Sequence, residues 1–417
     1  MILLVVYVAL LVGSMLIAGW VQHRRIRHDF ASLKTVTFGD ESAVYSSRAA
    51  SVVSIVTIFL IWGAFTGSAL TPIHVSGPFV GEVSFDYVAV NGAGEQDKGL
   101  VTVNVHRRGE TPDAPAIDPG EGFAGNHSAL VPERRSVLLK LAGEGTDPGF
   151  RIVEVNGTRI DPEKPVVLDS GTITPIANNT LLFEPYAGLQ MDPIWLPAPE
   201  SVAMRFVSIF RDGYQNSSLW EHVGASVLRV LAGFVVGSIV GIPLGYAMGL
   251  SSWLRGWFDP IVEFMRPVPP LALIPLIIIW FGIGEVGKVV LLFLAALWVM
   301  VIAARAGVAG IRISKIHAAY SLGASKWQIL LHVIIPNSLP DIFTGARVAM
   351  GVCWGTVVAA ELVAAQRGAG MMILVASKFQ LTDIVLMGII VIGVIGYAID
   401  ISLRFLERLL VPWKGRV

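Results

Sequence analysis

The sequence contains a series of apolar segments that are long enough to cross a lipid bilayer. Residues 222–249 are one example, a long apolar run that is rich in glycine. About 20 apolar residues in a helix span the hydrocarbon core, where the backbone must satisfy its own hydrogen bonds. The sequence therefore predicts a mainly α-helical, polytopic membrane protein. Seven spans are expected, at residues 1–21, 47–70, 222–249, 271–282, 286–306, 340–364 and 383–405.

The composition supports this class and divides the charge between two regions. Hydrophobic residues make up 54% of the chain and charged residues 15%, which excludes an ordinary soluble enzyme. Residues 71–200 contain 18 Asp and Glu against 9 Lys and Arg, whereas the rest of the chain contains 13 against 22. Basic residues favour the cytoplasmic side, so we expect residues 71–200 outside and the C-terminus in the cytoplasm. The single Cys353 excludes a disulfide framework and a cysteine-based metal site.

The first 46 residues are expected to form an extra membrane span and a cytoplasmic linker. Residues 1–21 carry no basic residue before their apolar core, and the basic run 23–28 follows them. A secretory signal has the opposite order of charge, so the segment is interpreted as an uncleaved span. A peripheral hydrophobic anchor is the alternative.

Residues 71–195 are expected to form a β-rich domain outside the membrane. The region is rich in Gly and Pro, and Asn156-Gly157 is a strong two-residue hairpin signal. Residues 108–126 are predicted to be a loop. His74, His106 and His127 are scattered, and no spacing typical of a nucleophile, a base or a metal site is present. Strand-like alternation occurs at 101–105, 136–141, 151–155, 165–168 and 180–183.

The segment 317–340 predicts a pair of short helices between two spans. Gly323 can adopt the left-handed conformation that ends a helix, and Ser325 with Gln328 forms a capping box that starts another. Pro336 and Pro340 are expected to stop this second helix. A basic cytoplasmic loop of this kind suggests a docking element for a soluble partner. An amphipathic linker between spans is the alternative.

Small and charged residues inside the spans are candidates for packing and permeation. Gly233, Gly237, Gly241, Gly245 and Gly249 place a small-residue stripe on one helix face, which favours close helix packing. The proline-interrupted run 259–282 is expected to be a broken helix near a transport path. The candidates for the permeation path are Glu263, Arg266, Trp354 and Glu361.

Charges within spans are costly, and most of them should be paired. For Glu361 two interpretations stand: a polar gate, or a buried pair with Arg367 that holds an external re-entrant segment. Arg347 is expected to snorkel toward the inner surface, and Asp400 is expected to pair with Arg404.

One motif resembles a phosphate-binding loop and is rejected. Residues 282–288 fit G-x-x-x-x-G-K, but Val289 occupies the position where Ser or Thr must bind magnesium. The motif also follows a membrane span instead of a β-strand. The chain is therefore not expected to hydrolyse ATP or to bind a cofactor itself.

The spacing of Ala318-Ala319, Gly323, Ile335-Pro336 and Leu339-Pro340 resembles the EAA motif of ABC-importer permeases. His317 stands where that motif commonly has Glu. The segments 258–285, 318–325, 351–372 and 406–415 are similar to permeases of the nitrate/taurine branch, and most similar to its taurine-transport members. The resemblance covers about 47–70 and 196–417.

The resemblance implies a type I importer permease fold with an inserted β-rich domain. Residues 47–70 would be the first core span, 71–195 the insertion, and 196–417 the permease domain with its coupling loop at 307–340. The residues implied in coupling to the ATPase are His317, Ala318, Ala319, Leu322, Gly323, Ala324, Ser325, Pro336 and Pro340.

The resemblance also implies a function and a set of partners. A second copy of the chain, a pair of ATPase subunits that bind ATP and Mg²⁺, and a periplasmic solute-binding protein would assemble with it in a bacterial inner membrane. Taurine or a related sulfonate would be the cargo, with nitrate, bicarbonate or another small solute as alternatives. No nucleic-acid partner is expected. An ATP-independent secondary transporter, or an external domain that acts as a sensor or enzyme, are the competing function classes.

Overall fold

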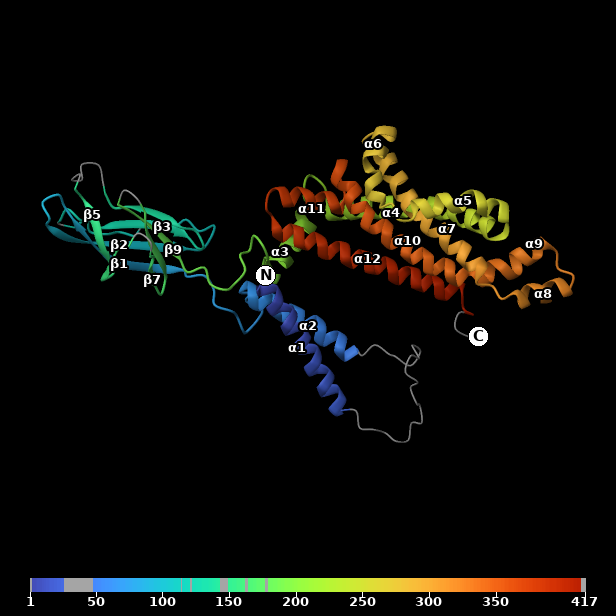
Figure 1. The fold of residues 1–417 in the computed structure, drawn as a ribbon, viewed down its shortest axis with the longest axis horizontal. Coiled ribbons are helices and arrows are strands. Elements are labelled where there is room, and N and C mark those ends of the chain that lie inside the picture. The colour runs from blue at the N-terminus through green and yellow to red at the C-terminus, as the bar shows by residue number, and fades with distance from the viewer. Residues whose placement is uncertain are drawn as a thin grey trace. The chain divides into compact units, whose positions relative to one another are not determined.

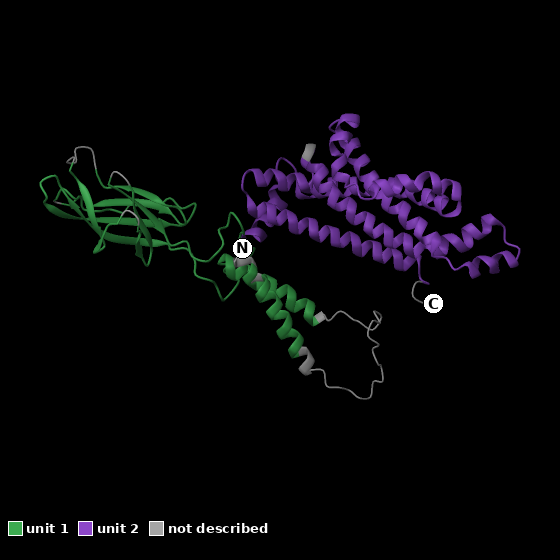
Figure 2. Ribbon diagram, viewed as in Figure 1, with its two compact units in different colours: residues 1–200 green, residues 201–417 purple. Residues whose placement is uncertain are grey.

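A computed structural model describes residues 2–25, 48–113, 115–120, 122–142, 149–161, 164–176 and 179–413. The chain forms two compact units, residues 1–200 and 201–417 (Figure 2). Most of the predicted cytoplasmic linker, at 26–46, lies outside the described residues. So do the last four residues of the chain.

The first unit begins with two apolar helices that contact each other, α1 (Ile2–Arg25) and α2 (Arg48–Thr66). They correspond to the first two predicted spans. Because α2 clusters with residues 1–200, the span that the resemblance assigns to the permease core belongs to the first compact unit here. Leucine, isoleucine and valine side chains are exposed along both helices, as expected of surfaces that face lipid.

The two chain segments that join α2 to the β-rich region are hydrogen-bonded to the end of α2. The amide of Val75 donates to the Ala64 carbonyl over 3.2 Å, and the amide of Met191 donates to the Phe65 carbonyl over 2.8 Å. The outgoing and returning segments are therefore both fixed on the last turns of this helix.

The insertion is a β-sandwich, which confirms the predicted β-rich region. One sheet has the order β3-β2-β1-β5-β6 and the other β4-β9-β8-β7. The strands are β1 (Gly81–Val90), β2 (Gln96–His106), β3 (His127–Pro132), β4 (Val137–Lys140), β5 (Arg151–Val155), β6 (Thr158–Arg159), β7 (Val166–Leu168), β8 (Gly171–Ile176) and β9 (Thr180–Pro185). The β2–β3 pair is parallel and the other pairs are antiparallel.

The core of the sandwich lies between the two sheets. Phe85 of β1 stacks on Phe183 of β9 with ring centroids 6.2 Å apart. Tyr87 is fully buried, and its hydroxyl donates to the Gly125 carbonyl over 2.7 Å. This burial, together with the charge of Asp97, raises the pKa of Tyr87 to about 12.

All five predicted strand segments coincide with strands. The predicted hairpin turn is also present, because Asn156 and Gly157 have φ values of +46° and +72° between the paired strands β5 and β6. Strands β1, β3 and β8 were not predicted. The alternation Val83, Phe85, Tyr87 in β1 was the signal for the longest of them.

The second unit is helical and is built on four long helices, α4, α7, α10 and α12 (Figure 1). Short helices α8 and α9 lie at one end of this bundle, and α11 lies at the opposite end. The helices are α3 (Pro199–Asp212), α4 (Leu219–Leu250), α5 (Ser252–Met265), α6 (Ile274–Phe281), α7 (Glu285–Ala309), α8 (Ile313–Ser321), α9 (Lys326–Ile329), α10 (Ile335–Ala364), α11 (Ala369–Lys378) and α12 (Thr382–Leu410).

Among the described residues, five helical segments are long and apolar enough to span a membrane. A bent pair makes a sixth if it is counted as one span: α5 meets the helical segment Pro270–Phe281 at 93°. This bend confirms the predicted broken helix, and Pro269 and Pro270 lie at the break. The apolar part of α1, Val8–Val21, is shorter. The total of seven spans stays a prediction.

The glycine stripe of α4 packs against α7, as its spacing predicts. A Cβ atom at Gly237 would lie 2.7 Å from the Cβ of Ala296 and 2.9 Å from the Phe293 carbonyl oxygen. A Cβ atom at Gly241 would lie 2.9 Å from the Leu297 carbonyl oxygen. The backbones of α4 and α7 can approach this closely only because these positions have no side chain.

We predict that Gly237→Ala destabilises the bundle by about 1–3 kcal/mol, because the added methyl group forces α4 and α7 apart. The measurement is the midpoint of thermal unfolding in detergent, followed by tryptophan fluorescence. Gly224→Ala is the matched control: it lies on the same helix with no atom within 4 Å of the new methyl group, so it should leave the midpoint unchanged or raise it slightly. Equal midpoints for the two variants would contradict the close packing.

Candidate functional site

The loop between α7 and α10 has the predicted helix–glycine–helix form. Helix α8 ends before Gly323, whose φ is +80°. The Ser325 hydroxyl accepts a hydrogen bond from the Gln328 amide, and the Gln328 side chain accepts one from the Ser325 amide. The glycine turn and the capping box are therefore both confirmed as local structure.

The predicted end of the second helix is wrong. Helix α9 continues through a π-helical segment, Leu330–Ile334, directly into α10. Pro336 lies in the first turn of α10 and Pro340 lies inside it. Prolines in a helix remove backbone donors, yet the helix continues through both positions. Next to Pro336, the Asn337 side-chain amide donates to the Val333 carbonyl over 2.6 Å.

The tip of this loop carries exposed apolar side chains. Tyr320, Leu322 and Trp327 are 50%, 88% and 65% exposed. His317 and Ala318 are exposed beside them, and Ala319 and Ala324 are partly covered. Large apolar side chains grouped on a polar loop are typical of a surface that binds another protein.

A cluster of charges, buried except for Glu285, which is 60% exposed, joins four helices at the end of the bundle that carries α11. The guanidinium of Arg229, on α4, binds Glu361 of α10 (Nη1–Oε1 2.6 Å) and Glu285 of α7 (2.5 and 2.8 Å). It also donates to the Arg367 carbonyl over 2.8 Å. Side chains of Arg229 and Glu361 are 8% and 0% exposed. Lys288 adds a second cation, 2.9 Å from Glu285.

This arrangement corrects the predicted partner of Glu361. Its ion pair is with Arg229, which is 132 positions away in the sequence, and the Arg367 side chain instead pairs with Glu221 at the surface. An exposed residue near in sequence was the wrong choice, because a fully buried carboxylate needs a buried cation. Glu361 also accepts a hydrogen bond from the Gly370 amide at the start of α11. That this segment is external and re-entrant stays a prediction.

Three consecutive amides at the start of α11 bind side chains from α4 and α10. Gly368 N donates to His222 Nδ1 over 3.2 Å, Ala369 N to Ser226 Oγ over 2.9 Å, and Gly370 N to Glu361 Oε2 over 2.9 Å. The other ring nitrogen of His222 lies 2.9 Å from the Tyr214 carbonyl. His222 therefore accepts at Nδ1 and donates at Nε2, which is the neutral ring. The sequence analysis missed His222, Ser226 and Arg229.

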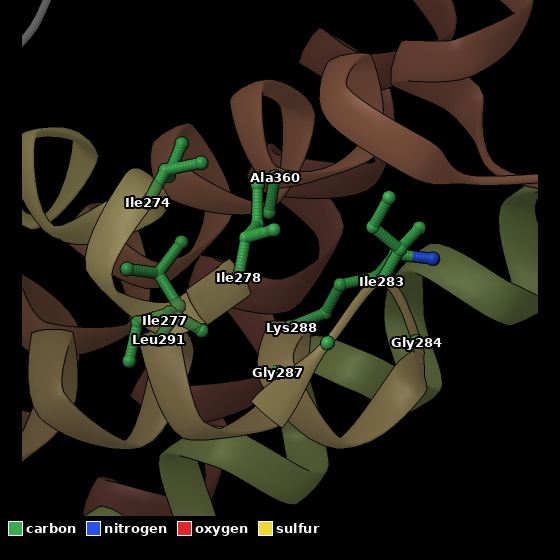
Figure 3. A pocket seen from close by; sticks show the side chains of 10 residues that line it. Ile274, Ile277, Ile278, Ile283, Gly284, Gly287, Lys288, Leu291 and Ala360 are labelled. Atoms are coloured by element: carbon green, nitrogen blue, oxygen red, sulfur yellow. The ribbon is translucent and has the colours of Figure 1, made fainter. Parts of the chain in front are cut away.

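A small apolar pocket adjoins this cluster (Figure 3). Isoleucines of α6 line one side, and Lys288 and Leu291 of α7 line another. Its volume of about 30 Å³ is roughly that of one water molecule, so the pocket does not accommodate an organic solute. Lys288 belongs to the rejected phosphate-loop motif, and its ammonium group binds a carboxylate instead.

The other predicted candidates do not form one site with Glu361. Glu263 and Arg266 pair with each other at 3.7 Å near the end of α5. Trp354 donates to the Ile392 carbonyl over 3.1 Å and so binds α10 to α12. All four residues remain candidates for the permeation path only by prediction.

A second pair of charged residues joins α10 and α12. Arg347 of α10 binds Asp400 of α12 at 2.9 Å, a partner that the sequence analysis did not name, and its snorkelling stays a prediction. Asp400 also binds Arg404 at 2.8 Å, as predicted. Within the part of the chain that the structure describes, no group of His, Cys, Asp or Glu has the geometry of a metal site.

We predict that Arg229→Met destabilises the protein by about 3–5 kcal/mol, because it leaves Glu361 buried without a cation. Adding Glu361→Gln should recover part of that loss. Arg367→Gln is the matched control at an exposed pair, with an expected effect below about 1 kcal/mol. The midpoint of unfolding in detergent measures all three. Equal effects of the Arg229 and Arg367 variants would contradict the buried network.

The chain resembles known membrane transport proteins in sequence. Residues 233–411 match the family described as the binding-protein-dependent transport system inner membrane component. The taurine transport system permease protein TauC of Escherichia coli is 44% identical over 233 residues, which cover 55% of this chain and 85% of that protein. The putative aliphatic sulfonates transport permease protein SsuC of E. coli is 40% identical over 219 residues, or 52% and 82%.

A solved structure of the MetNI methionine ABC transporter in an inward-facing conformation is also similar. It is 20% identical, has a TM-score of 0.39, and the match covers 46% of this chain and 93% of that chain. The assignment to a family rests on the sequence relationship, because the chain aligns with 85% of the length of a relative that is 44% identical. The chain therefore belongs to the family of ABC-importer permeases, the membrane-spanning transport subunits that work with a separate ATPase.

Proposed function

We propose that this permease imports taurine or a closely related sulfonate, driven by ATP hydrolysis on its partner subunit. The observation that carries the proposal is the similarity to two permeases whose names specify taurine and aliphatic sulfonates, at 44% and 40% identity. Nitrate, bicarbonate and other small solutes are the alternative cargoes within the same importer class.

The proposed assembly contains two copies of this chain, a pair of ATPase subunits and a periplasmic solute-binding protein. The exposed loop surface around Leu322 and Trp327 supports a docking site for the ATPase. ATP and Mg²⁺ bind the ATPase in this proposal, and the permease holds no cofactor. The bacterial inner membrane is the proposed location, with residues 71–200 periplasmic and the C-terminus cytoplasmic.

The geometry suggests how movement of the loop reaches the far end of the bundle. Residues 326–364 are continuously helical through α9, the π segment and α10. Glu361, near the end of this rod, binds Arg229 of α4 and the start of α11. When the paired ATPases close on ATP, a displacement of α9 would therefore be carried along α10 to α4, α7 and α11. This motion would alternate the access of the pathway between the two faces of the membrane.

The first test is transport by the complete complex in liposomes. We predict that the permease, its ATPase and the binding protein take up radiolabelled taurine only when ATP is present on the ATPase side. Uptake of nitrate or bicarbonate in place of taurine would support the ATP-driven importer but contradict taurine as its cargo. Taurine uptake that does not depend on ATP would reject the importer mechanism in favour of a secondary transporter.

The second test concerns the loop. We predict that Gly323→Val lowers ATPase binding and taurine-stimulated ATP hydrolysis at least tenfold, because a β-branched residue resists the left-handed backbone at φ +80°. Gly323→Asn is the matched control: asparagine tolerates this conformation, and no atom lies within 4 Å of the new Cβ. Co-purification with the ATPase measures binding. If the Gly323→Val complex binds the ATPase and hydrolyses ATP as the wild type does, the loop is not the docking site for the ATPase.

A further inference from the structure

The β-rich domain contains a cavity that its sheets do not fill. The cavity has a volume of about 580 Å³, which lies in the range of small-molecule sites. Its walls come from the end of β2, the turn between β3 and β4, and the returning segment at 192–194. The amide of Met191, next to that segment, is hydrogen-bonded to α2. The cavity therefore lies close to the last turn of a predicted membrane span.

The cavity concentrates positive charge in an acidic region. Arg108, Arg134 and Arg135 line it, and they are three of the nine basic residues between 71 and 200. Only two acidic residues, Glu133 and Asp192, lie among them. The wall has a net positive charge, whereas the region as a whole has twice as many acidic as basic residues.

The guanidinium groups are not neutralised by these two carboxylates. Arg108 approaches Asp192 only to 4.0 Å, and the Asp192 carboxylate already accepts a hydrogen bond from the Ile194 amide. In the described part of the chain, the Arg135 side chain has no hydrogen-bond or ion-pair partner. Arg108 and Arg135 are both exposed, so the donors of their guanidinium groups are open to water and to a ligand in the cavity.

Arg134 is held in position by the backbone. Its φ of +62° is uncommon for a residue other than glycine, and such outliers occur often at functional sites. Its Nη2 donates to the Gln190 carbonyl over 2.8 Å, while its Nε is buried without an acceptor. A buried donor without a partner is unusual, and a bound water or ion commonly satisfies it.

We propose that this cavity binds an oxyanion group, such as a sulfonate, carboxylate or phosphate. The planar fork of a guanidinium matches two oxygens of these groups, and Arg is the preferred residue for such contacts. The oxyanion can come from a small soluble acid or from the headgroup of an anionic lipid, since the cavity lies near the end of α2. The site does not depend on which solute the permease transports.

The test uses the full-length chain in lipid nanodiscs, without the binding protein. Ethanesulfonate is titrated by calorimetry at constant ionic strength, in discs of phosphatidylcholine and in discs that also contain phosphatidylglycerol. The test variant combines Arg108→Gln with Arg135→Gln. It leaves Arg134 unchanged, because that side chain also binds the Gln190 carbonyl. The matched control is Arg107→Gln, an exposed arginine beside the cavity that does not line it. An unchanged thermal midpoint verifies that each variant is folded.

For a soluble ligand, we expect the wild type to bind ethanesulfonate with equal affinity in both kinds of disc. The double variant should lower this affinity at least tenfold, and Arg107→Gln should lower it less than twofold. For a lipid ligand, we expect phosphatidylglycerol to compete with ethanesulfonate, or to co-purify with the wild type and not with the double variant. The proposal is overturned if neither anion is bound, or if the double variant binds both as the wild type does. Neither result depends on taurine transport, so failure here and failure of the proposed function are distinguishable.

Discussion

The buried guanidinium of Arg229 is the interaction on which the arrangement of the helical unit most depends. Burying a charge is costly unless it is paired and fully hydrogen-bonded. Arg229 meets this condition only when Glu285, Glu361 and the Arg367 carbonyl converge on it from other parts of the chain. Helices α4, α7 and α10 must therefore meet at one point. The Glu361 carboxylate also binds the start of α11 there, through the Gly370 amide. The network specifies a single arrangement of these elements, whereas apolar packing alone tolerates several.

Close packing along α4 and α7 complements the ion pairs of Arg229. Lipid tails are as apolar as leucine, so membrane helices gain little from burying apolar surface against each other. The glycine stripe instead lets the two backbones approach, which strengthens dispersion contacts along the whole length. The closely packed α4–α7 pair has the ion pairs of Arg229 at one end, and α8 and α9 lie at the opposite end of the bundle (Figure 1). The unbroken helix from 326 to 364 connects these two ends.

The β-sandwich lies outside the residues that match the permease family. It has its own core of buried aromatic and aliphatic side chains, and both of its connections to the membrane are hydrogen-bonded to α2. An insertion with a complete core can be accommodated without disturbing the rest of the chain, because its two ends lie close together. Its arginine-lined cavity is a property of this insertion and not of the family fold.

The sequence alone determined the class of protein, the β-rich insertion, the glycine stripe, and the glycine turn and serine cap within residues 317–340. These features depend on local pattern: run length, alternation, four-residue spacing, and the chemistry of a glycine turn and a serine cap. No local pattern identifies the partner of Glu361 or Arg347, because both partners lie more than 50 positions away. Local pattern also predicts that the helix stops at Pro336 and Pro340, whereas in the folded bundle it continues through both positions by way of a π segment. Tertiary structure decided the buried network and the arginine-lined cavity, because each requires distant segments whose charges become neighbours only after packing.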